Sequence, residues 1–142
     1  MSLKNKKSGF TLLEVIIVII IVGVLASLAL PRFFSTVEYS RATEAMQSIA
    51  STRQSLERCY LMTSSYATCV AGSTDFERLD IDDPGTSPNN HFTYGIAAGA
   101  STYTITATRN TRDGGDGSST VVLSFDGTDI TRSGTGPFGA VQ

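Results

Sequence analysis

Gly9-Phe10-Thr11-Leu12-Leu13-Glu14 leads directly into the apolar run from Val15 to Leu30, and this stretch decides the fold of the chain. The 21 residues from Phe10 to Leu30 span about 31 Å as an α-helix, which is the thickness of a bilayer core. A secretory signal has only about 7 to 15 apolar residues. The sequence therefore predicts a hydrophobic transmembrane helix over residues 10–30.

The charges around this run predict its orientation. All three lysines lie within residues 1–9, and only Arg32 follows the run closely before acidic residues appear. By the positive-inside rule, the N-terminus stays in the cytoplasm and residues 31–142 are exported. Removing residues 1–9 leaves 8 basic and 13 acidic side chains. This acidic balance does not indicate a nucleic acid partner, because phosphate contacts need clustered Lys and Arg.

Glu14 is an ionisable residue close to the start of the apolar run. A charged side chain at the centre of a membrane helix costs on the order of 3 kcal/mol. One interpretation is that Glu14, one turn from the helix start, reaches the headgroups and interacts with the positive helix end. The other is functional, since acids inside membrane segments generally mark sites.

Residues Lys6-Lys7-Ser8-Gly9-Phe10-Thr11-Leu12-Leu13-Glu14-Val15 resemble the processing and assembly motif of bacterial type IV pilins and pseudopilins. The resemblance extends to Pro31, which follows the apolar run. It implies that residues 1–9 are a basic leader peptide, which a prepilin peptidase cuts between Gly9 and Phe10. A glycine before the cut lets a protease approach the backbone closely. The resemblance also implies N-methylation of Phe10 by the same enzyme.

The resemblance further implies a homopolymer of many copies. Phe10 and Glu14 would set the assembly register, the new amine of one subunit meeting the carboxylate of its neighbour. The precursor would lie in the inner membrane, where it meets the pilus assembly platform, and the mature subunit in an extracellular filament. No cofactor is expected.

A second helical segment is expected over residues 31–60. Its pattern is amphipathic and it has no internal Gly or Pro after Pro31. Phe34, Met46 and Leu56 are expected in the core, whereas Phe33 and Tyr39 are candidates for contacts with other subunits. Gly23 and Pro31 are weak points where the helix is expected to kink or loosen.

Cys59 and Cys69 lie beyond the apolar run with a spacing that does not indicate a metal site. In an exported domain, a lone pair of cysteines most simply forms a disulfide. Such a bond would pin a connector loop over residues 61–90 to the end of the helix. The chain has no cysteine after Cys69, unlike many larger pilins, in which a disulfide closes a C-terminal loop.

Residues 91–142 are predicted to form a small antiparallel sheet, with strands expected over 91–96, 102–109, 120–125 and 128–131. Tyr103, Ile105 and Ala107 alternate with threonines, which is the period of a sheet with one wet face. Asp126-Gly127 predicts a hairpin turn. The expected fold class is therefore α+β, a long N-terminal helix packed on about four antiparallel strands, which is also the type IV pilin fold.

Catalytic and metal sites are not indicated. No Ser-His-Asp set, nucleotide-binding glycine loop or paired carboxylates can be recognised, so an enzyme is not expected. Asp113 and Asp116 are weak calcium candidates, but two aspartates fall short of six ligands and do not have EF-hand spacing. His91 has no Cys or His companions and is expected to be structural or on the surface.

Three functions follow from the sequence. The first is a structural subunit of a type IV pilus, with a major pilin among the possibilities. The second keeps the filament architecture and makes the chain a pseudopilin of a type II secretion or DNA-uptake system. The third is a singly anchored periplasmic binding module that never polymerises.

Overall fold

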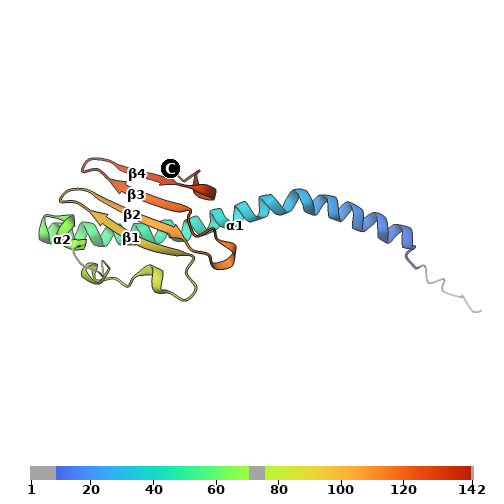
Figure 1. Cartoon of the computed structure of the whole chain (residues 1–142), viewed down its shortest axis with the longest axis horizontal. Helices are drawn as coiled ribbons and strands as arrows, with labels where there is room; N and C mark the ends of the chain where they lie inside the picture. The colour runs from blue at the N-terminus through green and yellow to red at the C-terminus, as the bar shows by residue number, and fades with distance from the viewer. Residues whose placement is uncertain (1–8, 71–75, 142) are drawn as a thin grey trace, which may run out of the picture. The chain divides into compact units, whose positions relative to one another are not determined.

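The computed structural model describes residues 9–70 and 76–141. Lys4, Lys6 and Lys7 of the predicted leader lie outside the described residues, as does part of the predicted connector loop. The chain divides into two compact units, Met1–Thr36 and Val37–Gln142. The helix α1 runs through both, and the sheet belongs to the second (Figure 1).

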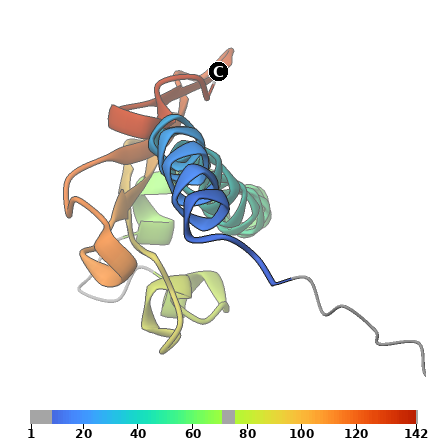
Figure 2. The same cartoon turned by 90° about the vertical axis from the view of Figure 1, so that its right-hand side faces the viewer.

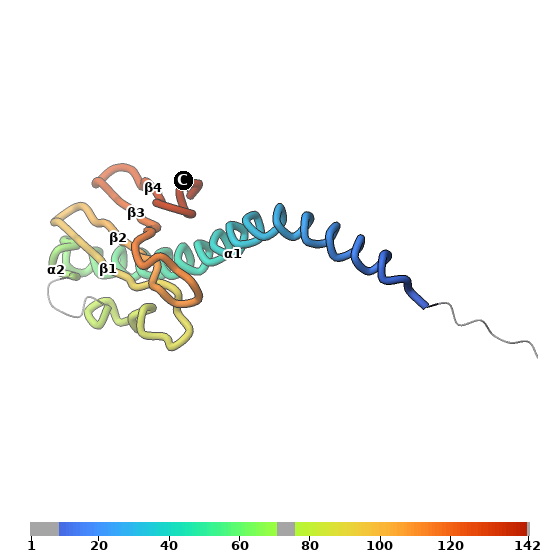
Figure 3. The backbone as a smooth tube through the Cα atoms, turned by 45° about the vertical axis from the view of Figure 1, so that its right-hand side comes forward, coloured from blue at the N-terminus to red at the C-terminus, as the bar shows by residue number. Residues whose placement is uncertain are grey.

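Helix α1 extends from Leu12 to Thr63 and contains both Gly23 and Pro31. The smooth tube of Figure 3 follows this helix from residue 12 to residue 63 without a break. Proline removes a single N–H donor, and the strongly helical segments on both sides keep the helix continuous. The helix ends where Ser64 adopts a left-handed φ of 57°, with the Ser64 N–H donating to the carbonyl of Tyr60 at 2.7 Å.

The second half of α1 buries one stripe of side chains against the sheet. Seen along the helix in Figure 2, the sheet lies on one side of this part of α1. The stripe recurs at intervals of three and four residues, the spacing of one helical face, and consists of Ala42, Ala45, Ile49, Thr52, Ser55 and Leu56. Leu56 is buried and Met46 half-buried as predicted. The prediction for Phe34 is wrong within a single chain, because Phe34 is 62% exposed and lies before the covered stripe.

The region predicted as a connector loop contains short helical segments. Helix α2 covers Tyr66–Val70, and 3-10 turns cover Glu77–Leu79 and Pro84–Thr86. The Asp83 carboxylate accepts from the Gly85 N–H at 2.7 Å and caps the second of these turns. The described part of this connection therefore contains more helical structure than its turn-rich sequence indicated.

The sheet is a four-stranded antiparallel meander in the order β1-β2-β3-β4. Its strands are Phe92–Ala98, Tyr103–Arg109, Thr120–Phe125 and Ile130–Gly134. The predicted turn joins β3 to β4: the Asp126 carboxylate accepts from the N–H groups of Thr128 and Asp129, both at 2.8 Å. Gly127 has a φ of 103°, which a side chain would disfavour. The predicted fold class is confirmed.

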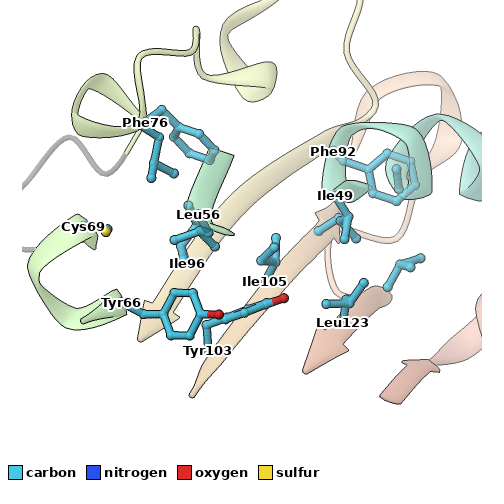
Figure 4. Close-up of a cluster of buried hydrophobic side chains, with 14 of the residues drawn as sticks. Ile49, Leu56, Tyr66, Cys69, Phe76, Phe92, Ile96, Tyr103, Ile105 and Leu123 are labelled. Carbon is cyan, nitrogen blue, oxygen red and sulfur yellow. The ribbon is translucent and has the colours of Figure 1, made fainter. Parts of the chain in front are cut away.

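The core lies between α1, α2 and the inner face of the sheet. Figure 4 shows side chains from these elements converging, including Ile49 and Leu56 from α1 and Ile105 and Leu123 from the strands. Phe138, in the 3-10 turn Gly136–Phe138, is fully buried, with its ring 5.6 Å from that of Phe92. Burying one such side chain contributes about 1.5–3 kcal/mol.

Candidate functional site

The start of α1 holds Glu14 in a capping box. Thr11 precedes the helix, and its backbone N–H and hydroxyl both donate to Glu14 Oε2, at 2.7 Å and 2.9 Å. The Glu14 N–H donates in return to the Thr11 hydroxyl at 3.2 Å. This reciprocal pairing satisfies N–H groups that have no partner inside the helix. The signal was present in the sequence, because Thr-x-x-Glu before an apolar run is the usual pattern of this cap.

The apolar half of α1 is uncovered in the single chain. From Leu12 to Leu30, its large hydrophobic side chains are 40–77% exposed. A candidate membrane span is found within α1, and its apolar window is 0% buried. Beyond Leu30, three aromatic side chains are also 55–63% exposed: Phe33, Phe34 and Tyr39. The helix therefore presents an extended apolar surface without polar cover.

Gly9 and Phe10, the predicted cleavage pair, lie just before the helix. Phe10 is 90% exposed, and a Cβ added at Gly9 would meet no atom within 4 Å. The bond between these two residues is therefore open to approach. Nothing in the fold of the described chain requires glycine at this position.

Cys59 and Cys69 form the predicted disulfide, with their Cα atoms 6.1 Å apart. It joins the last turns of α1 to α2. Next to it, the ring of Tyr66 stacks on that of Tyr60 at 4.3 Å and meets that of Tyr103 edge-on at 4.8 Å. The disulfide thus holds α2 over an aromatic cluster at the end of α1.

Arg109, at the end of β2, is a buried charge that sequence reasoning missed. Its side chain is 1% exposed and forms two hydrogen bonds with the Glu38 carboxylate, at 3.0 Å and 3.3 Å. It also donates to the carbonyls of His91, Asn110 and Arg112 at 2.9–3.1 Å. A buried guanidinium with this many partners fixes the end of the sheet to α1.

Glu38 carries its charge in a half-buried setting between two arginines. Burial acts to raise the pKa of its carboxyl, but the hydrogen bonds and charges of Arg109 and Arg41 outweigh burial and lower it below the usual value. Glu38 is therefore ionised in the folded chain at neutral pH.

Glu57, near the other end of the sheet, accepts hydrogen bonds from two tyrosine hydroxyls. Tyr66 donates to its Oε2 at 2.9 Å and Tyr103 to its Oε1 at 3.1 Å. Burial, followed by these bonds to a carboxylate, raises the pKa of both tyrosines. The two hydroxyls therefore remain protonated and act as donors that orient α2 and β2 on α1.

The carboxylates of Asp113 and Asp116, the weak calcium candidates, contact other groups of the protein. Asp116 accepts from the N–H groups of Ser118 and Ser119 at 3.0 Å and 2.9 Å and from the Ser119 hydroxyl, and these bonds lower its pKa to about 2. Asp113 faces His91, with Nε2 at 3.1 Å from Oδ2. Among residues 9–70 and 76–141, no group of three or more His, Cys, Asp or Glu side chains could hold a metal ion. We assign neither aspartate as a metal ligand.

Comparison with known families adds to this geometry. Residues 31–120 match the family model described as "Type IV minor pilin ComP, DNA uptake sequence receptor". The chain belongs to the type IV pilin family. Residues 4–30 match the "Prokaryotic N-terminal methylation motif", which includes the predicted cleavage pair and the apolar half of this pilin's helix. The resemblance read from the sequence is thereby confirmed.

The relatives of this pilin include pilus and secretion proteins. The Type IV major fimbrial protein FimA of Dichelobacter nodosus is 32% identical over 80 residues, covering 56% of this chain and 51% of FimA. The Type II secretion system core protein G of Aeromonas hydrophila is 38% identical over 69 residues, or 49% and 48% of the two chains. The Type IV narrow pilus major component PilA5 of Thermus thermophilus is 29% identical over 114 residues, or 75% and 93%.

The pilin spans about half the length of the first two of these relatives. No solved structure matches it. The family and its relatives are pilins and pseudopilins, which are structural proteins.

Proposed function

We propose that this chain is a structural subunit of a type IV pilus, polymerised with many copies of itself through its N-terminal helix. The observation that carries the proposal is the uncovered apolar half of α1, from Leu12 to Leu30. Such a surface is stable in lipid or against other apolar helices but not in water. Because both surroundings are equally dry, transfer from membrane to filament core changes the environment little.

Processing would occur between Gly9 and Phe10, followed by N-methylation of Phe10. The open backbone at Gly9 supports this, since a Cβ there has free space within the chain. A requirement for glycine would therefore come from the prepilin peptidase, whose active site must approach the scissile bond.

Glu14 would pair with the Phe10 amine of a neighbouring subunit in the filament. The capping box engages only Oε2 of Glu14. A carboxylate offers about four lone-pair directions on two oxygens, so acceptor capacity remains for the amine. A subunit out of register would leave a buried charge without its partner, at a cost of about 3–5 kcal/mol. The pair would thus select the axial register.

The precursor would lie in the inner membrane with its N-terminus in the cytoplasm, and the mature subunit in an extracellular filament. The length and composition of the apolar helix, together with the three lysines before it, support this topology. The prepilin peptidase and the inner-membrane assembly platform would be its partners during export. We propose no catalytic activity.

A second candidate is a pseudopilin of a type II secretion or DNA-uptake system. The description of the matched family as a DNA uptake sequence receptor, and the likeness to core protein G, favour it. Electrostatics count against direct DNA binding, because residues 31–142 hold 8 basic and 12 acidic side chains. A singly anchored periplasmic module is the third candidate. The exposed apolar helix is compatible with such an anchor but does not require it.

Deleting the gene and imaging the cell surface by electron microscopy separates these functions. A pilus subunit predicts loss of surface filaments, restored by the wild-type gene. Intact pili combined with loss of protein secretion or of DNA uptake would contradict the pilus subunit and support the pseudopilin. Intact filaments, secretion and uptake would contradict both.

A further inference from the structure

His91 lies between α1 and the segment that joins β2 to β3. Its Nδ1 is 2.9 Å from Glu44 Oε2 on the helix, and its Nε2 is 3.1 Å from Asp113 Oδ2 in the 3-10 turn Arg112–Gly114. The His91 backbone N–H also donates to Glu44 Oε1 at 3.4 Å. One imidazole ring thus connects two carboxylates that are far apart in the sequence.

Both ring nitrogens can donate only when the ring is an imidazolium. A neutral histidine has one N–H and one lone pair. In its neutral form, one nitrogen would direct its lone pair at an ionised carboxylate about 3 Å away, which is repulsive. Donation to both carboxylates therefore requires the charged ring, and loss of the proton removes one of the two bonds.

The charges around His91 also favour the charged ring. On α1, Arg41 binds Glu38 and lies 4.0 Å from Asp113 Oδ2, and on β2, Arg109 donates to the His91 carbonyl at 3.1 Å. Three carboxylates, those of Glu38, Glu44 and Asp113, thus face two guanidinium groups. An imidazolium brings this cluster to neutrality.

Two further titratable groups lie nearby. The guanidinium of Arg112 donates to the carbonyl of Pro88. Tyr94, on β1, has its pKa raised mainly by burial and stays neutral at physiological pH. Histidine is the side chain whose charge ordinarily changes between pH 5 and 8, which makes His91 the candidate switch of this cluster.

We propose that His91 is a pH-sensitive clamp, which in its protonated form adds a bridge from Asp113 through the ring to Glu44 on α1 and loses one of its two bonds when the proton leaves. Because only the protonated ring can donate to both carboxylates, this bridge to the segment 110–119 is favoured as the pH falls and weakened as it rises. Asp113 has a φ of 50°, a left-handed conformation that aspartate tolerates but that still relies on its contacts. The inference does not depend on the filament function.

Hydrogen–deuterium exchange of the full chain in detergent micelles tests the clamp. Peptides covering residues 111–118 are compared at pH 5.5 and pH 8.0, after correction for intrinsic exchange rates. We expect about threefold slower exchange at pH 5.5, a modest change because Asp113 is 59% exposed and exposed ion pairs are weak. Equal exchange at the two pH values would overturn the clamp.

Two variants assign the effect to the ring. His91→Gln removes the titrating group, and we expect fast exchange at both pH values. Asp113→Asn supplies an amide that can donate to a neutral ring nitrogen, so we expect slow exchange to persist at pH 8.0. If either variant keeps the pH dependence of the wild type, another group is responsible and the proposal fails.

Discussion

Glu14 has one role in the single chain and a second, proposed role in the filament. In the single chain it completes a capping box with Thr11, and in the proposed filament it receives a neighbour's amine. The first role needs a hydrogen-bond acceptor, whereas the second needs a negative charge. Substitutions can therefore separate them.

Glu14→Gln keeps an acceptor for the cap and removes the charge. We expect membrane insertion to remain and the yield of sheared surface filaments to fall more than tenfold, because the neighbour's amine would lose its buried partner. Thr11→Ala is the matched control: it weakens the cap by about 1 kcal/mol and leaves the charge. Comparable filament losses in both variants would mean that Glu14 acts only as a cap.

Arg109→Met should be among the most destabilising substitutions in the sheet. It removes two hydrogen bonds from the half-buried Glu38 and one donor from each of three carbonyls. Removing one partner of a buried ion pair costs about 3–5 kcal/mol. Thermal unfolding of the full chain in detergent measures this loss.

Arg132→Met on the exposed strand β4 is the control for Arg109→Met. Surface substitutions of this kind change stability by less than about 0.5 kcal/mol. Equal unfolding midpoints for the two variants would show that the buried pair does not hold β2 to α1.

The residue-scale features differ in how far the sequence reveals them. The cap at Glu14 follows from local spacing and could be predicted. Arg109 and Glu38 are 71 residues apart, so only the fold brings them together. The same holds for Glu57 with Tyr103, which are 46 residues apart.

Periodicity in the sequence predicts the strands of the unit Val37–Gln142. Strand β2 alternates buried and half-buried side chains along its whole length, which is the two-residue period read from the sequence. Helix α2, only five residues long, has too few residues to show a helical period. The spacing of Phe34 continues the stripe and so predicts a core position, but Phe34 precedes the unit Val37–Gln142, which contains the core, and is exposed.

The disulfide between Cys59 and Cys69 should contribute to the stability of the folded chain by holding α2 to α1. Replacing both Cys59 and Cys69 by serine removes a ten-residue loop constraint, worth about 3 kcal/mol in the loop-entropy model. We expect the unfolding midpoint of the full chain to fall by about 10 °C. Adding reductant to the wild type should reproduce this fall, whereas an unchanged midpoint would show that α2 is held by Tyr66 and its neighbours alone.

At the scale of the whole molecule, the chain combines two units suited to different solvents. The unit Val37–Gln142 has a buried core and an outer surface rich in hydroxyl groups. The unit Met1–Thr36 has no core of its own among its described residues, and its side chains from Leu12 to Leu30 are exposed. A chain with this division needs lipid or other copies of itself to cover half of its helix.

Mass analysis of the N-terminus in the sheared extracellular fraction tests this account most directly, because it reports cleavage, methylation and export together. The account predicts filaments built from a chain that begins with N-methylated Phe10, with residues 1–9 absent. Full-length protein retained in the inner membrane, with no extracellular form, would contradict it.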